Sequence, residues 1–284
     1  VNWKFFCDNF NESYHTRFVH PQVPSVIDQD HFTSRYEMFP KGHARIIQMG
    51  RPSLRDRVNE DEDHPFKMIL ESWGVDVSQY PDYETLSEQG WTDLKKAKRK
   101  LYKEKGYHHY ENLSDEELTE SPFQFIFPNI AMGVQADGCI LLNWFPHPTD
   151  PEKCFFDLWD MGYPIGGSAK GIGKTGRDND QAFTSTSAGI GKKDEANDQE
   201  FLSRTKVNPV KLQEVELDFR DYDGGKGVED LWDHVVYQDW QLTDGLRRGV
   251  RSKGYQEPYL AAQETRVRYF HETLHDYLNE KEPK

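Results

Sequence analysis

Apolar residues recur in short runs through the first part of the chain, and these runs predict strands. They are rich in aromatic and β-branched residues and are bounded by turn residues, as is typical of a sheet. The runs cover residues 36–39, 44–49, 123–134, 139–145 and 154–159. A turn at residues 40–43 separates the first two, and Asp137-Gly138 predicts a hairpin before the fourth. Pro128 is expected to interrupt the third run, because proline donates no ladder hydrogen bond.

Longer stretches carry the spacing of helices instead. They cover residues 85–105, which are dense in Lys and Arg, and residues 228–249 and 259–279 towards the C-terminal end. Before the last two helices, the stretch from Gly166 to Glu200 is rich in Gly, Ser, Lys and Asp. This composition predicts a long flexible loop or an insertion.

Composition and charge exclude several classes of protein. The 284 residues and 33.3 kDa suffice for one large domain or two small ones. A formal charge of −14 argues against a nucleic-acid surface, which needs a basic patch. No run approaches the roughly 18 apolar residues of a membrane span. No signal peptide is visible either, so we expect a cytoplasmic protein.

The first twenty residues hold a candidate metal site. Glu12, His15 and His20 place a carboxylate and two imidazoles within nine residues. Neutral imidazoles suit divalent iron, and two His with one carboxylate leave coordination positions open for dioxygen and substrate. On a helix Glu12 and His15 share a face, whereas His20 lies about 140° around from His15. Both imidazoles reach one ion only if the helix ends near His20, and Pro21 predicts that end because it disfavours helical backbone before it. The alternative is an amphipathic helix with two solvated histidines.

This run resembles the start of the catalytic domain in the α subunits of Rieske-type ring-hydroxylating oxygenases. In that family the run reads acidic, Asn, aromatic, any, Glu or Asp, any, Tyr, His, four residues, His. Every one of these places is filled between Asp8 and His20.

A second stretch resembles the same family. Members show Glu-Asp, then a helix, then Gly-Leu-any-Ser-any-any-Tyr, with the Asp ten residues before that glycine. Asp239 stands ten residues before Gly249. The stretch departs from the pattern in two places, because Gln238 replaces the usual Glu and Arg247 replaces a common Gln. Other acidic residues nearby are rival ligands, namely Asp230, Asp233 and Asp244.

The resemblance implies an α+β fold in which a long C-terminal helix clasps an antiparallel sheet. This is the helix-grip fold of Bet v1-like and START-like proteins. Residues 1–284 would then form one mononuclear-iron catalytic domain, with Fe(II) held by His15, His20 and Asp239. Glu12 occupies the position of the family's bridging carboxylate, through which an electron passes from a partner's cluster to the iron.

The implied reaction uses O2 to hydroxylate, dihydroxylate or dealkylate a small apolar or aromatic molecule. Electrons come from a Rieske [2Fe-2S] cluster, reduced by a reductase or ferredoxin, in a homotrimer or an α3β3 assembly. Such a cluster needs two Cys and two His. Cys7, Cys139 and Cys154 form neither half of its ligand pattern, so the cluster domain is expected to precede Val1 in the full protein. Strand aromatics such as Phe123 could line the substrate pocket or belong to the core.

Two other hypotheses stay open on the sequence. The first is a non-enzymatic module of the same fold that binds hydrophobic ligands and purifies without iron. The second is a zinc hydrolase, because His271 and His275 form an HExxH motif. Only nine residues follow His275, too few for a glutamate ligand further on. Residues 167–175 resemble a phosphate-binding loop, but Ser168 stands where its first glycine belongs, so a substrate-access loop or an insertion is favoured.

Overall fold

The computed structural model describes residues 1–56, 64–162, 183–187, 213–215, 231–256 and 258–281. Its helices are α1 (Trp3–Phe10), α2 (Thr16–Val19), α3 (Pro65–Ser72), α4 (Tyr83–Leu101), α6 (Leu231–Gly249) and α7 (Thr265–Leu278). Its strands are β1 (Arg35–Phe39), β2 (His43–Met49), β3 (Glu120–Ile126), β4 (Ile130–Gln135), β5 (Gly138–Pro146), β6 (Cys154–Gly162), β7 (Phe183–Ser187) and β8 (Gln213–Val215). Short 3-10 turns include η2 (Pro40–Gly42) and η6 (Ala262–Glu264).

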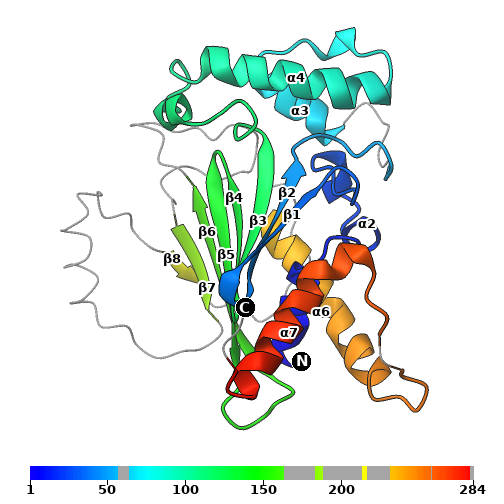
Figure 1. The fold of residues 1–284 in the computed structure, drawn as a ribbon. Coiled ribbons are helices and arrows are strands. Elements are labelled where there is room, and N and C mark those ends of the chain that lie inside the picture. Colours follow the sequence, from blue (N-terminus) through cyan, green and yellow to red (C-terminus); the bar gives the residue numbers. More distant parts are fainter. Residues whose placement is uncertain (57–63, 163–182, 188–212, 216–230, 257, 282–284) are drawn as a thin grey trace, which may run out of the picture.

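In the described part of the chain these strands form one sheet in chain order, from β1 to β8 (Figure 1). Neighbours are antiparallel from β1 to β7, and β8 pairs parallel with β7. All five predicted runs are confirmed as strands, and Pro128 divides the third run into β3 and β4. The predicted hairpin joins β4 and β5, but its two-residue turn is Ala136-Asp137, one residue earlier than expected, because Gly138 already pairs with Gln135. β7 lies inside the stretch from Gly166 to Glu200, whose other residues lie outside the described ranges.

Three helices cover one face of the sheet. Phe6 of α1 stacks on Trp144 of β5, with ring centroids 6.1 Å apart, and Trp3 meets Phe270 of α7 edge-on. The main core joins side chains of α1, α6 and α7 to the facing side of β2 to β6: Phe6, Cys7, Ala44, Phe125, Ala131, Ile140, Leu142, Trp144, Leu158, Val236 and Phe270. Burial of this apolar surface holds the helices on the sheet.

α7 grips the sheet at the turn between β1 and β2. Tyr269 donates a hydrogen bond from its hydroxyl to the Phe39 carbonyl at 2.6 Å. Gly42 has φ +85°, and a Cβ there would lie 2.8 Å from Cγ2 of Thr273 on α7. Only glycine therefore allows the turn and the helix to approach this closely. The α+β helix-grip prediction is confirmed.

α3 and α4 form a separate layer at one end of the sheet (Figure 1). Their core is rich in aromatic residues and is built on Phe66, Leu70, Trp73, Tyr80, Leu86, Leu94, Tyr107, Tyr110 and Leu118. The predicted helix at 85–105 corresponds to α4, which begins and ends earlier than expected. None of the helices in the described ranges is both long and apolar enough to cross a membrane.

Candidate metal centre

The backbone between α1 and α2 departs from the helix that the spacing suggested. α1 ends at Phe10, so Glu12 lies in the following turn and His15 is the N-cap residue of α2. The expectation that Glu12 and His15 share a face of one helix is therefore wrong. The helix end at His20 is confirmed, because this residue has φ −122° and ψ 68° directly before Pro21.

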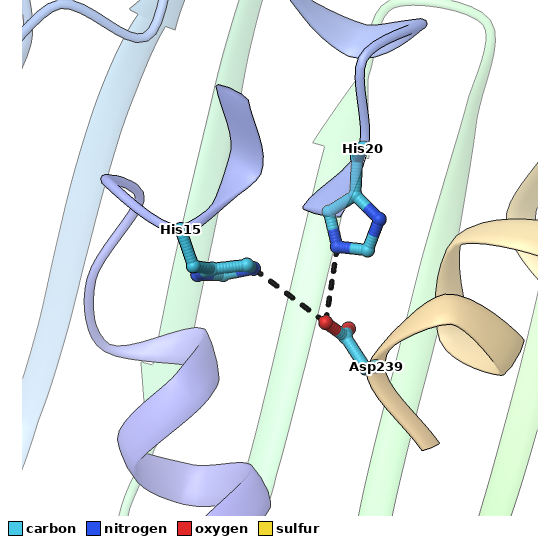
Figure 2. Close-up of side chains that lie close together, drawn as sticks. All are labelled: His15, His20 and Asp239. Atoms are coloured by element: carbon cyan, nitrogen blue, oxygen red, sulfur yellow. Dashed lines mark ion pairs between the residues drawn. The ribbon is translucent and has the colours of Figure 1, made fainter. Parts of the chain in front are cut away.

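Three side chains from opposite ends of the chain converge. One ligand atom each of His15, His20 and Asp239 lies within 4.8 Å of the others. Figure 2 shows both imidazoles turned towards the carboxylate that α6 supplies. Asp239 Oδ1 lies 3.0 Å from His20 Nε2 and 3.7 Å from His15 Nε2. In the described part of the chain no other group of three or more His, Cys, Asp or Glu could hold a metal ion.

The second ring nitrogen of each histidine is bonded to an acceptor. Glu12 Oε1 accepts from His15 Nδ1 at 2.5 Å, and Gln238 Oε1 accepts from His20 Nδ1 at 2.8 Å. Gln22 Nε2 donates to the same Gln238 oxygen at 2.9 Å. In the neutral ring an acceptor at Nδ1 places the proton on Nδ1, so the lone pair of each Nε2 faces Asp239.

The charges of the site favour a cation. Burial opposes a charge on His15, but its bond to Glu12 and the carboxylates of Glu12 and Asp239 together raise its pKa above the ordinary value. His20 Nε2 and Asp239 Oδ1 are buried without a hydrogen-bond partner. Two acceptor lone pairs 3.0 Å apart repel each other unless a proton or a metal cation lies between them. These residues therefore fit a divalent metal, and two His with one carboxylate suit non-haem Fe(II).

A cavity of about 60 Å³ lies beside the three ligand atoms. Part of its wall is apolar and comes from Phe10, Val23, Ile27, Ile46, Phe123 and Val235. The polar part includes Asn9, Gln29 and Gln48. Phe123 of β3 thus lines the cavity, whereas Trp144 of β5 in the same sheet lies in the core and is 1% exposed.

The other sequence candidates lie elsewhere. Asp244 is exposed and pairs with Arg247, and Asp230 and the side chain of Asp233 lie outside the described residues. His271 and His275 are exposed on α7. His271 Nε2 bonds Asp8 Oδ1 at 2.7 Å. The loop at 167–175 also lies outside the described residues.

A sheet clasped by helices, with two histidines and one carboxylate beside a partly apolar cavity, defines a helix-grip domain with the ligand set of a mononuclear metal centre. The model of one family, described as Ring hydroxylating alpha subunit (catalytic domain), matches residues 1–161 and 211–280. The chain belongs to this family, and it is therefore the oxidoreductase catalytic domain of a ring-hydroxylating oxygenase α subunit. A search of curated proteins and a search of solved structures each returned no match.

Proposed function

We propose that residues 1–284 are one mononuclear-iron catalytic domain in which His15, His20 and Asp239 hold Fe(II). The domain hydroxylates, dihydroxylates or dealkylates a small, largely apolar or aromatic molecule. When bound, the iron supplies the means of activating O2, with electrons from a Rieske [2Fe-2S] cluster. One observation carries this proposal: both Nε2 lone pairs and Asp239 Oδ1 converge, while both Nδ1 atoms are bonded to acceptors.

The chain's own residues hold the ligands and shape the cavity. Glu12 and Gln238 fix the ring orientation and the tautomer of the two histidines. Val235 and Val236 are buried, and they anchor the helix that carries Asp239. The apolar wall orients a substrate and excludes water from the space beside the ligands.

Iron analysis of protein purified without oxygen tests the ligand set. We expect about one iron per chain, and loss of that iron in His15→Ala and in His20→Ala. His271→Ala and His275→Ala serve as matched controls, since both histidines are exposed on α7, and they should keep the iron. Iron that survives both pocket substitutions would place the metal elsewhere. Wild-type protein that takes up no iron would favour the ligand-binding module of the same fold.

Glu12 is proposed to carry the electron from a partner subunit to the metal centre, in a homotrimer or α3β3 assembly supplied by a reductase or ferredoxin. Its carboxylate bonds His15 Nδ1, so it already contacts a proposed ligand on the side away from Asp239. The neighbouring side chains of Tyr14 and Phe18 are 41% and 74% exposed, so they offer apolar surface near Glu12 to a partner subunit.

In protein that includes the cluster domain, Glu12→Gln should keep the iron and slow electron transfer by orders of magnitude. Rapid mixing of the reduced protein with O2 and substrate measures that step. Loss of iron in Glu12→Gln would instead show that the carboxylate is needed to hold the metal.

A further inference from the structure

Two glutamines belong to the polar part of the cavity wall and are not proposed metal ligands. Gln48 lies on β2, on the same face of the strand as Ala44 and Ile46. Ala44 faces the core and Ile46 faces the cavity. Its side chain lines the cavity and the residue is 1% exposed. Gln29 lines the same cavity from the segment between α2 and β1. A buried amide at an apolar position costs stability unless its hydrogen bonds are made.

The two amides make one hydrogen bond to each other, and one polar atom of each is left without a partner among the described residues. Gln29 Nε2 donates to Gln48 Oε1 at 3.4 Å. Gln48 Nε2 and Gln29 Oε1 are buried, and neither has a partner among the described residues. If both amides are turned over, the bond runs the other way and one donor and one acceptor are again left. The pair therefore presents a free donor beside a free acceptor in either orientation.

A third polar atom lies in the same wall. Asn9 also lines the cavity, and its buried Nδ2 has no partner among the described residues. The rest of the wall includes Val23, Ile46 and Phe123, whose side chains give the cavity an apolar surface. A molecule that satisfies this cavity has an apolar body and one polar group that both donates and accepts.

We propose that Gln48 and Gln29 bind a hydroxyl or a primary carboxamide on the substrate and thereby orient its apolar part towards His20 and Asp239. The inference rests on the proposed function, since it treats this cavity as the substrate site of the metal centre. It narrows the substrate class from apolar molecules in general to those with such a group. A plain hydrocarbon would leave the amides buried and unpaired, and sites of this kind reject analogues that lack the polar group.

Binding of matched probes to the iron-loaded chain tests the proposal by calorimetry. Phenol and benzamide carry the two candidate groups, and toluene carries neither. We expect phenol or benzamide to bind at least about tenfold more tightly than toluene. Gln48→Met should bring this ratio close to one. Gln29→Met is the second variant if Gln48→Met does not fold. Gln124→Met is the matched control, because Gln124 lies on β3 next to cavity-lining Phe123 and so faces the other side of the sheet. Its ratio should match the wild type.

A further arm separates this proposal from the iron proposal. His15→Ala, which should lack iron, is expected to keep the preference for phenol or benzamide. A preference that persists there is due to the amides and cannot come from a phenol oxygen bound to metal. The subsite is refuted if Gln48→Met and Gln29→Met keep the wild-type ratio, if the ratio disappears in His15→Ala, or if none of the three probes binds. Each of these results leaves the iron analysis to decide the proposed function independently.

Discussion

Gln238 is expected to set the strength of metal binding without touching the metal. Its Oε1 holds His20 Nδ1 at 2.8 Å, and the His20 side chain is only 3% exposed. Gln238→Leu removes the acceptor and leaves a buried N–H unpaired, which costs about 1–3 kcal/mol. Since 1.4 kcal/mol is a factor of about ten, the Fe(II) dissociation constant should rise about 10–100-fold, the range found for groups that orient metal-ligating histidines.

The assay is competition for Fe(II) against a coloured chelator without oxygen. Gln22→Leu is the matched control, because Gln22 bonds the same oxygen at 2.9 Å but contacts no proposed ligand in the described structure. It should shift the constant by less than about threefold, well under the effect of losing a partner of a ligand. Gln238→Glu should act in the opposite direction, since a charged acceptor makes a stronger hydrogen bond to the imidazole. The reasoning is refuted if Gln238→Leu binds iron as tightly as the wild type while His20→Ala does not bind it.

Three further predictions concern stability and the cavity. The hydrogen bond that His271 donates to Asp8 raises the pKa of His271 although burial opposes it. This pair should therefore stabilise the fold below pH about 6.5 and lose its effect as pH rises through the higher folded pKa. Because both side chains are exposed, His271→Asn should lower the free energy of unfolding by less than about 1 kcal/mol. The difference in melting temperature between the wild type and this variant should shrink from pH 5.5 to pH 8.5. Gly133→Ala places a Cβ 2.8 Å from Cγ2 of Ile140 and 2.9 Å from Cε1 of Phe123. This overpacking should cost about 1–3 kcal/mol in urea unfolding, and displacement of the Phe123 ring should weaken toluene binding. Removing the metal with a chelator should lower the melting temperature, whereas His15→Ala should melt at the same temperature with and without chelator.

The sheet could be predicted because each of its first six strands has its own local sequence signal. Aromatic and β-branched runs between turn residues gave β1 to β6, and Pro128 gave the break between β3 and β4. α7 begins at Thr265 and not at the predicted residue 259, although Tyr259 and its neighbours suit a helix. Tyr259 is 95% exposed, so no packing offsets the cost of extending the helix there. β7 is rich in Thr and Ser, and composition alone favoured a loop for it.

The site was only partly predictable from local pattern. Spacing and Pro21 indicated how His15 and His20 could reach one ion, but no spacing rule connects them to Asp239 at the other end of the chain. The resemblance to a family supplied that residue. The role of Gln48 was missed, although a signal existed, because its amide interrupts an alternation that Ala44 and Ile46 establish on β2. A polar residue at a strand position that faces the core is worth treating as a candidate contact for a ligand.

The two halves of the candidate metal centre differ in how firmly the protein alone fixes them. His15 and His20 are held by a short helix, by Pro21 and by hydrogen bonds at Nδ1. Asp239 depends on α6, whose described apolar side chains are buried at its start but exposed further on: Leu242 at 44% and Leu246 at 46%. An ion that binds all three residues would therefore add a connection between the N-terminal segment and α6, beside the contacts that Val235 makes with Val23 and Ile27. Because such an ion binds only the folded site, its affinity adds directly to the stability of the fold, and α6 should gain most from it.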